Sequence, residues 1–282
     1  MKNKGIIPIN KPKGWTSFDV VNKLKYKLKP LKVGHLGTLD PMATGVLLVT
    51  VGKATKLFDL MQEKKKTYVA TFMFGVLTDT LDTTGTEIIN TKINPINEDA
   101  LKNVLPKFIG KLSQIPPMYS AKSVNGVRAY DLARKGVEIE LKPKEVEIYK
   151  LKILEFNGVE LKIEVTCGSG TYIRALGRDI AKELGTVATM TSLVRTKVGD
   201  FDLNSTIEIE NLEEIHDKIL PIKQILALQP LNLSDKEQFK LLNGQTLNMD
   251  ISDGTYSLED KHDTVAIVEI KENKAKMSVF LG

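Results

Sequence analysis

The chain has 282 residues, of which 42% are hydrophobic, so it can form one large hydrophobic core with a smaller unit beside it. Its formal net charge of +5 is compatible with an anionic partner but does not establish one. A single cysteine, Cys167, excludes intrachain disulfides and any Cys-x-x-Cys zinc site. No apolar run approaches the ~20 residues that span a bilayer, and no signal-peptide core is visible. We therefore expect a cytoplasmic protein without membrane or metal.

The basic residues divide unevenly. Only five of the 40 lysines and arginines are arginines, and they lie within one quarter of the chain, at Arg128, Arg134, Arg174, Arg178 and Arg195. In a composition so biased towards lysine, arginine is expected mainly where its planar fork pairs with carboxylate or phosphate, or stacks on bases. Arg134 fits better as ordinary surface charge.

The N-terminal segment predicts a strand followed by a helix. Residues 6–15 form a strand that ends in a turn. Thr16 or Ser17 is the expected N-cap of the helix. Four apolar side chains at helical spacing are expected on its buried face: Phe18, Val21, Leu24 and Leu28.

Asp40 lies in the segment 34–45, between three glycines and a proline. A carboxylate that attacks a substrate needs an exposed, stiff turn that a bulky ligand can approach closely. Glycine permits that approach, and Pro41 restricts Asp40 to extended geometry. Taken alone, the segment is more typical of an Asx-type turn between two core elements.

The next segments predict a buried strand over 45–51, a short helix over 53–61 and a strand over 68–74. In the helix, Ala54, Leu57, Phe58 and Met61 are expected to point inward. In the second strand, one face carries Tyr68, Ala70, Phe72 and Phe74. Because Tyr68 lies at the start of this strand, shortly after three lysines, we expect it to be exposed.

The middle of the chain is turn-rich over 75–96, with a helix predicted over 98–108. Two prolines and a glycine make 114–126 irregular. A short helix carrying Arg128 and Arg134 is expected to follow.

Two predicted strands, 146–156 and 159–167, are joined by Asn157-Gly158, the strongest short hairpin signal. The segment 168–172 opens a helix that ends at Gly185. From residue 229 the pattern changes to short strands and turns. We therefore predict an α+β fold, with a mixed or antiparallel sheet in a domain over 1–228 and a small β-rich domain over 229–282.

The chain resembles the TruB family of tRNA pseudouridine-55 synthases. Seven stretches carry the resemblance in chain order: residues 10–17, 34–45, 66–68, 79–85, 114–136, 170–179 and 193–201. The resemblance implies a catalytic domain of pseudouridine-synthase type and a C-terminal domain similar to the PUA module. It also implies a tRNA T-arm partner and a monomeric state. No cofactor is expected, because the isomerisation of uridine leaves its atoms and redox state unchanged.

The resemblance implies that Asp40 is the nucleophile. A carboxylate can add to C6 of the uracil or trap the sugar at C1′, and the sequence leaves both open. Arg174 is the expected partner of Asp40, because a guanidinium keeps a carboxylate ionised and oriented. Asp79 and Asp82 are expected to be turn formers without a metal.

A flipped uridine needs an aromatic surface to receive it. The resemblance implies that Tyr68 stacks on the uracil and assists proton removal from C5, and that Tyr172 and Leu193 line the same pocket. His35 is expected to fill the space left by the flipped nucleotide. The expected phosphate contacts are Lys13, Lys64, Lys65, Lys66, Lys122 and Arg128.

Two other functions fit parts of this pattern. An RNA-folding or RNA-binding protein would need the aromatic and basic surface but not Asp40. A guide-dependent synthase of related fold would act within a multi-protein particle, although its usual extensions are not obvious. A zinc deaminase lacks its Cys-x-x-Cys and His-x-Glu motifs here, and a Rossmann-type methyltransferase lacks its glycine-rich turn.

Overall fold

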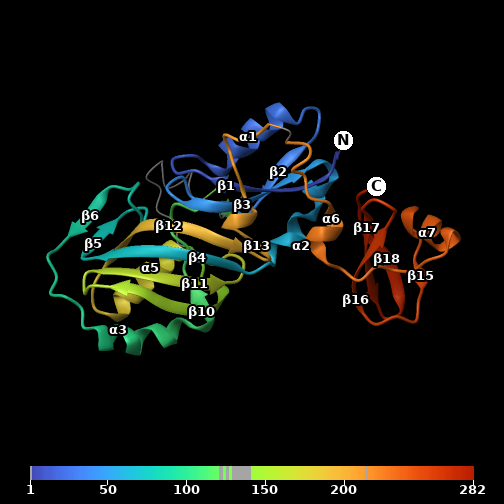
Figure 1. Ribbon diagram of the computed structural model, residues 1–282. Coiled ribbons are helices and arrows are strands. Elements are labelled where there is room, and N and C mark those ends of the chain that lie inside the picture. Colours follow the sequence, from blue (N-terminus) through green and yellow to red (C-terminus); the bar gives the residue numbers. More distant parts are fainter. Residues whose placement is uncertain (1, 121–122, 125–126, 129–140, 214) are drawn as a thin grey trace.

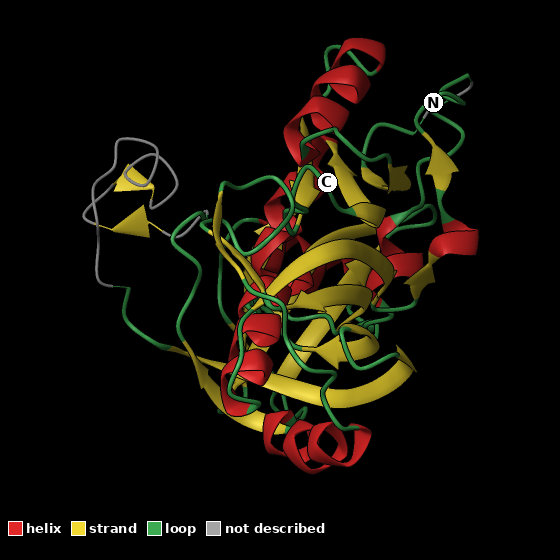
Figure 2. Cartoon of the chain, turned by 90° about the vertical axis from the view of Figure 1, so that its left-hand side faces the viewer, coloured by secondary structure: helices red, strands yellow, loops and turns green. Residues whose placement is uncertain are grey.

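The protein is described from a computed structural model, which covers residues 2–120, 123–124, 127–128, 141–213 and 215–282. It is an α+β molecule in which helices accompany one large mixed sheet, and a smaller sheet lies at the C-terminal end (Figure 1). The predicted fold class is confirmed. Figure 2 shows that the long strands of the large sheet are strongly curved, with helices beside them.

In the described part of the chain, the large sheet has ten strands. Its main path runs in the order β14 (Ile207–Glu208), β1 (Gly5–Lys11), β3 (Thr44–Val51), β12 (Ala188–Val198), β4 (Lys66–Phe74), β11 (Glu160–Cys167), β10 (Lys144–Phe156) and β7 (Gly110–Gln114). Off this path, β2 (Val33–Leu36) pairs with β3 and β13 (Phe201–Asp202) pairs with β12. The pairs β1·β14 and β12·β3 are parallel, and the others are antiparallel.

The helical elements are α1 (Ser17–Lys27), η1 (Gly52–Leu57), α2 (Phe58–Gln62), α3 (Glu98–Val104), η2 (Leu105–Phe108), α5 (Ile173–Glu183), η3 (Leu203–Ser205), α6 (Ile222–Leu226) and α7 (Asp235–Leu242). The helices α3 and α5 share a hydrophobic core with β4, β11 and β12. α1 packs on β1 and β3 in a second core.

The predicted start of α1 is confirmed. Thr16 is the N-cap, and it forms a capping box with Asp19. Val21 and Leu24 are buried as expected, but Phe18 is 64% exposed, so its inward placement was wrong. Val20 occupies the inward position instead, because the buried stripe of the helix runs through 20, 21, 24 and 28.

Two further burial predictions need correction. Phe58 is exposed, whereas Ala54, Leu57 and Met61 are buried as predicted. Tyr68 was expected to be exposed, but only 8% of it is. The physical reason is that β4 is a central strand, with β12 on one side and β11 on the other, so its first residues are already covered.

The hairpin predicted at Asn157-Gly158 joins β10 and β11. Asn157 Oδ1 accepts hydrogen bonds from the N–H groups of Val159 and Glu160, and Gly158 has φ +89°. The helix α5 ends before Gly185, which has φ +73°, as predicted.

Two short strand pairs were not predicted. A hairpin of β5 (Val76–Thr78) and β6 (Glu87–Asn90) lies in the turn-rich segment, and β8 (Ser123–Val124) pairs with β9 (Val127–Arg128). Arg128 is therefore in a strand rather than in the predicted helix. The rest of that helix, over 129–140, and Lys122 lie outside the described residues.

The C-terminal sheet consists of β15 (Leu247–Asn248), β18 (Lys274–Phe280), β17 (Thr264–Lys271) and β16 (Gly254–Glu259), in this order. It has its own core and is accompanied by α7, a helix that the sequence reading missed. Leu281 and Ile267 pack into a core shared with β1 and β3. We propose that the boundary between the two domains lies between residues 228 and 229. No helix in the described part of the chain combines the length and apolar character needed to cross a membrane.

Candidate active site

Asp40 lies in the loop between β2 and β3, and neighbouring elements hold this loop in place. The Leu39 N–H donates to Ser17 Oγ at 2.9 Å. The Gly14 N–H donates to the Pro41 carbonyl at 2.8 Å, and the Ala43 N–H donates to the Asp40 carbonyl at 3.0 Å. The start of α1 and the turn after β1 thus hold both sides of the Asp40 loop by hydrogen bonds.

The glycine of this loop that most needs its lack of a side chain is Gly45. Its φ is +105°, and a Cβ there would collide with the backbone carbonyl of Arg195. The two residues are register partners in the parallel pair of β3 and β12. The close approach that the sequence indicated at Gly45 is therefore made by the protein's own backbone and not by a ligand.

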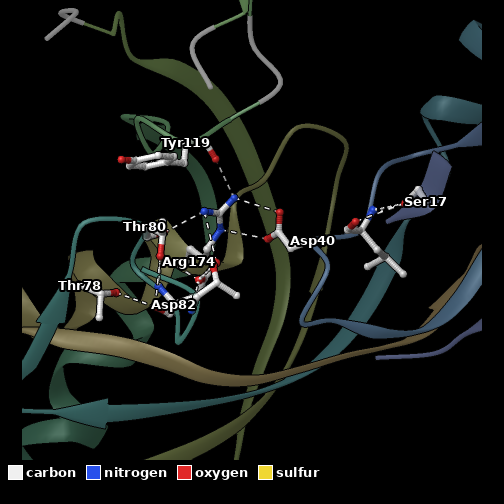
Figure 3. A network of polar contacts seen from close by, with 9 residues as sticks. Ser17, Asp40, Thr78, Thr80, Asp82, Tyr119 and Arg174 are labelled. Carbon is white, nitrogen blue, oxygen red and sulfur yellow. Dashed lines mark hydrogen bonds and ion pairs between the residues drawn. The ribbon is translucent and has the colours of Figure 1, made fainter. Parts of the chain in front are cut away.

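Arg174, on α5, forms a bidentate ion pair with Asp40 (Figure 3). Nε lies 3.0 Å from Oδ2, and Nη2 donates to Oδ1 at 3.0 Å. The same guanidinium donates to the carbonyls of Thr80 at 2.8 Å and Tyr119 at 3.0 Å. The expected pairing of Arg174 with Asp40 is present, and this arginine also ties two other segments to the carboxylate.

A third charged residue belongs to this group. The Asp82 carboxylate is buried, with Oδ2 3.5 Å from Nη1 of Arg174. Its Oδ1 accepts hydrogen bonds from Thr80 Oγ1 at 2.8 Å and from the Thr84 N–H at 2.9 Å. Asp82 is thus the turn former that the sequence predicted and also a second anionic partner of Arg174, which the sequence reading missed because the turn already explained it.

The Asp40 carboxylate is accessible to solvent and yet electrostatically perturbed. Its side chain is 31% exposed, against 7% for Arg174. Partial burial raises the pKa of Asp40 above its ordinary value, Arg174 opposes that rise, and the Asp82 carboxylate adds to it. The exposed oxygen atoms can reach a substrate while the guanidinium fixes the plane of the carboxylate.

Tyr68 and Arg195 face each other across the antiparallel pair of β4 and β12. The Arg195 side chain is buried, with Nε donating to the Val46 carbonyl at 2.7 Å and Nη2 donating to the Gly37 carbonyl at 3.1 Å. Burial raises the pKa of the Tyr68 hydroxyl, and the positive charge of Arg195 opposes this rise. The phenol of the free protein therefore carries its proton at neutral pH.

Two buried lysines lie near this pair. Lys66 was expected on the surface, but its Nζ donates to the carbonyls of Gln62 and Lys64 at 2.9 Å. Lys11 Nζ donates to the Trp15 carbonyl at 2.6 Å and to the Pro41 carbonyl at 3.4 Å. Burial lowers the pKa of each lysine to about 8. Lys66 is thus held inside the protein by backbone carbonyls, and its prediction as a surface phosphate contact was wrong. Lys11 links the turn after β1 to the Asp40 loop.

The remaining predicted residues lie at different depths. Leu193 on β12 is buried in the same core cluster as Tyr68. Tyr172 is the half-buried N-cap residue of α5. His35 on β2 is partly buried, its Nδ1 has no partner among the described groups, and burial lowers its pKa. Lys13 is exposed, and the Arg128 side chain lies outside what is described.

Gln114 is a further residue that sequence reasoning did not single out. Its side chain is buried and binds both backbone groups of Tyr172. Oε1 accepts a hydrogen bond from the Tyr172 N–H at 2.8 Å, and Nε2 donates to the Tyr172 carbonyl at 3.1 Å. This double contact fixes the start of α5, and hence the position from which Arg174 reaches Asp40. Its only sequence signal was its place two residues before Pro116 and Pro117.

Comparison of the structure with solved structures shows which fold this is. The chain resembles "Crystal Structure of a Cbf5-Nop10-Gar1 Complex", with a TM-score of 0.73, 24% sequence identity and coverage of 99% of this chain and 84% of that one. It also resembles "Structure of H/ACA RNP bound to a substrate RNA containing 2'-deoxyuridine", with a TM-score of 0.72, 23% identity and coverage of 99% and 85%. At these identities the likeness establishes the fold.

Sequence comparisons establish the family. Residues 23–173 match the model of the TruB family pseudouridylate synthase N-terminal domain, and residues 174–227 match the tRNA pseudouridylate synthase B C-terminal domain. The chain belongs to the TruB family of pseudouridylate synthases. It is 43% identical to the tRNA pseudouridine synthase B of Clostridium kluyveri over 96% of this chain and 93% of that protein. It is 42% identical to that of Fusobacterium nucleatum, over 96% of both chains.

Proposed function

We propose that this enzyme isomerises the uridine at position 55 in the T-loop of tRNA to pseudouridine. The observation that carries this proposal is the bidentate pair of Arg174 with Asp40, in which the carboxylate stays 31% exposed beside the buried Tyr68. The family membership and the relatives named tRNA pseudouridine synthase B support the substrate. We also propose that it acts in the cytoplasm, as a monomer.

The reaction needs only side chains. The C1′–N1 bond breaks, the uracil turns, and a C1′–C5 bond forms; the proton lost from C5 is balanced by one gained at N1. We propose that Asp40 is the nucleophile, at C6 of the ring or at C1′ of the sugar. Arg174 keeps its carboxylate ionised and oriented when the substrate excludes water.

The target base must leave its stack before Asp40 can reach it. We propose that Tyr68 and Leu193 receive the flipped uracil, with Tyr172 beside them. Because burial holds the pKa of the Tyr68 hydroxyl above its ordinary value, its ring serves first as a stacking surface, and proton removal from C5 would require help from a neighbouring charge such as Arg195. His35 and the exposed Lys13 are proposed to contact the RNA around the extruded nucleotide.

Replacement of Asp40 by asparagine tests this function. Asp40→Asn keeps the size of the side chain but removes the attacking anion, so turnover should be abolished. RNA affinity should stay within about tenfold of wild type, because binding does not depend on this one group. The protein is incubated with a T-arm stem-loop without metal, nucleotide or guide RNA, and the pseudouridine formed is measured by chemical mapping. Asp59→Asn, at an exposed position on α2, is the matched control.

The same experiment separates the other functions. Full activity of Asp40→Asn would rule out the nucleophile assignment. RNA binding without any conversion by the wild type would favour an RNA-folding or RNA-binding protein. Conversion only when a guide RNA and partner proteins are added would favour a guide-dependent synthase.

A further inference from the structure

The outer face of α1 is the most unusual surface that the active site leaves unexplained. Phe18 is 64% exposed and Tyr26 is 73% exposed, although the buried face of the helix is complete without them. α1 lies at the upper edge of the molecule in Figure 1, with its inner face on β1 and β3. Single exposed apolar residues are ordinary, but two large rings on one short helix are not.

Positive charge is concentrated around the same helix. Residues 13–32 contain six lysines and one acidic residue, Asp19. Their formal charge of +5 equals that of the whole chain, so the other residues together are neutral. The six lysines are all exposed: Lys13, Lys23, Lys25, Lys27, Lys29 and Lys32. A charge distribution this uneven produces a local positive potential on one face.

Lysines and rings are already interleaved. Lys29 Nζ lies 5.2 Å from the centre of the Tyr26 ring, and Lys23 Nζ lies 5.4 Å from that of Trp15. Trp15 and Lys23 also line a shallow pocket of about 410 Å³ with Gly14, Asp19 and Asn22. The Trp15 and Tyr26 rings therefore each have a lysine close by, and Phe18 and Tyr26 stay exposed on the helix surface.

We propose that this α1 face binds a second, unpaired segment of the substrate RNA, outside the nucleotide that enters the active site. Rings that stack on bases, combined with lysines that neutralise phosphates, are the combination by which proteins hold single-stranded nucleic acid. An acidic protein partner would use the lysines but has no need of two open rings. The RNA as occupant rests on the proposed function.

The α1 face is physically joined to the catalytic loop. Ser17, the first residue of α1, hydrogen-bonds through Oγ to the backbone of Leu39. Gly14, which lines the pocket beside Trp15, donates its N–H to the Pro41 carbonyl. An RNA segment that reaches the pocket beside Trp15 would therefore contact Gly14, which hydrogen-bonds to the Asp40 loop, so one RNA molecule could contact both places.

Removal of the two rings tests the stacking part. Phe18→Leu with Tyr26→Leu keeps apolar side chains on the helix surface but removes the rings. We expect the Kd for an unmodified full-length tRNA transcript, measured by fluorescence anisotropy, to rise on the order of tenfold. Phe280→Leu is the matched control, because Phe280 is also partly exposed and carries Lys53 at 4.8 Å from its ring centre.

Removal of two lysines tests the electrostatic part. Lys25→Gln with Lys27→Gln should reduce the slope of log Kd against log salt concentration by about 0.7 to 0.9 per lysine. The control is Lys152→Gln with Lys182→Gln, which removes two exposed lysines from β10 and α5. The control should keep the wild-type slope.

Several results would overturn the proposal. These are unchanged tRNA affinity in the ring variant, an equal loss in Phe280→Leu, or a loss of binding that is seen only with anionic lipid vesicles and not with tRNA. The readout is binding and needs no turnover. A wild-type protein that binds tRNA through α1 but forms no pseudouridine would therefore contradict the proposed function alone, and an active enzyme with an indifferent α1 would contradict this inference alone.

Discussion

Two groups of buried positive charge meet the Asp40 loop, and they are balanced in different ways. Arg174 lies between two carboxylates, Asp40 and Asp82. On the other side, Lys66 and Arg195 are held by backbone carbonyl oxygens. Neither of these two cations has an ion pair with a carboxylate among the residues that the structure describes.

The difference has an electrostatic consequence. Carbonyl oxygens satisfy the hydrogen bonds of a buried cation but do not neutralise its charge. Burial and the neighbouring Arg195 accordingly lower the pKa of Lys66 to about 8. The same guanidinium opposes the rise in the pKa of the Tyr68 hydroxyl. The paired group orients the proposed nucleophile, whereas the unpaired group keeps the tyrosine side of the pocket positive.

Loss of the paired arginine should have the largest effect. Arg174→Ala leaves the buried Asp82 carboxylate without its cation and removes the donors to Thr80 and Tyr119. We expect the free energy of unfolding to fall by roughly 3 to 5 kcal/mol, because a buried charge is left uncompensated. Urea unfolding at neutral pH measures this.

The kcat of Arg174→Lys tells whether Arg174 acts by orienting Asp40 or only by its positive charge. Arg174→Lys keeps the positive charge but cannot make the two parallel contacts to Asp40. We expect its kcat to fall on the order of 100-fold. Arg178→Lys is the matched control, because Arg178 lies on the same helix and pairs with Asp179 at its surface. An unchanged kcat in Arg174→Lys would contradict the role of the bidentate pair.

The buried Lys66, which has no carboxylate partner among the described residues, should make the free energy of unfolding depend on pH. Below pH 8, Lys66 is protonated in the folded and the unfolded chain alike, so its titration does not make stability change with pH there. Between about 8 and the ordinary value of 10.5 the unfolded chain holds a proton that the folded chain has lost, so the free energy of unfolding rises with pH. Each such lysine contributes up to about 1.4 kcal/mol per pH unit, and Lys11 adds a second share.

Lys66→Met removes one of these two contributions. Urea unfolding between about pH 7.5 and pH 10 should then show a smaller rise with pH than in the wild type. Lys152→Met, at an exposed position, should leave the dependence on pH as it is. An identical rise in wild type and Lys66→Met would show that Lys66 keeps its proton in the folded chain over this range. The pKa of Lys66 would then not be lowered by its burial beside Arg195.

The sequence predicted most of what local signals determine. Turn and cap residues such as Thr16, Asn157 and Gly185 lie where they were expected, because their hydrogen bonds and backbone angles depend on a few neighbours. The predictions for Phe18 and Tyr68 were wrong in opposite directions: Phe18 was expected to be buried and is exposed, and Tyr68 was expected to be exposed and is buried. In both cases the outcome depends on which elements cover the residue, and a helix or strand pattern does not contain that information.

The candidate site shows the same division. The resemblance indicated Asp40 with Arg174, which the structure brings together. Gln114 escaped notice, and Asp82 was predicted only as a turn former, because each acts through a distant segment, Tyr172 in one case and Arg174 in the other. Such contacts arise only when the chain has folded, so spacing along the sequence does not reveal them.

The smallest expected effect concerns Asp82 and is a shift in pH dependence. The Asp82 carboxylate contributes to the raised pKa of Asp40. If ionised Asp40 is the active form, kcat/KM falls as the pH falls through that pKa, which lies above the usual value of 3.8. Asp82→Asn keeps the acceptor for Thr80 and Thr84 but removes the charge.

The acid limb of kcat/KM should therefore move to lower pH in Asp82→Asn, because Arg174 then opposes only one carboxylate. Asp79→Asn is the matched control: Asp79 lies in the same turn and accepts the Thr86 N–H, but it makes no ion pair with Arg174 in the described structure. A limb that moves to higher pH would mean that Asp82 acts by holding Arg174 against Asp40. Its contribution would then be to the geometry of the pair and not to the charge around it.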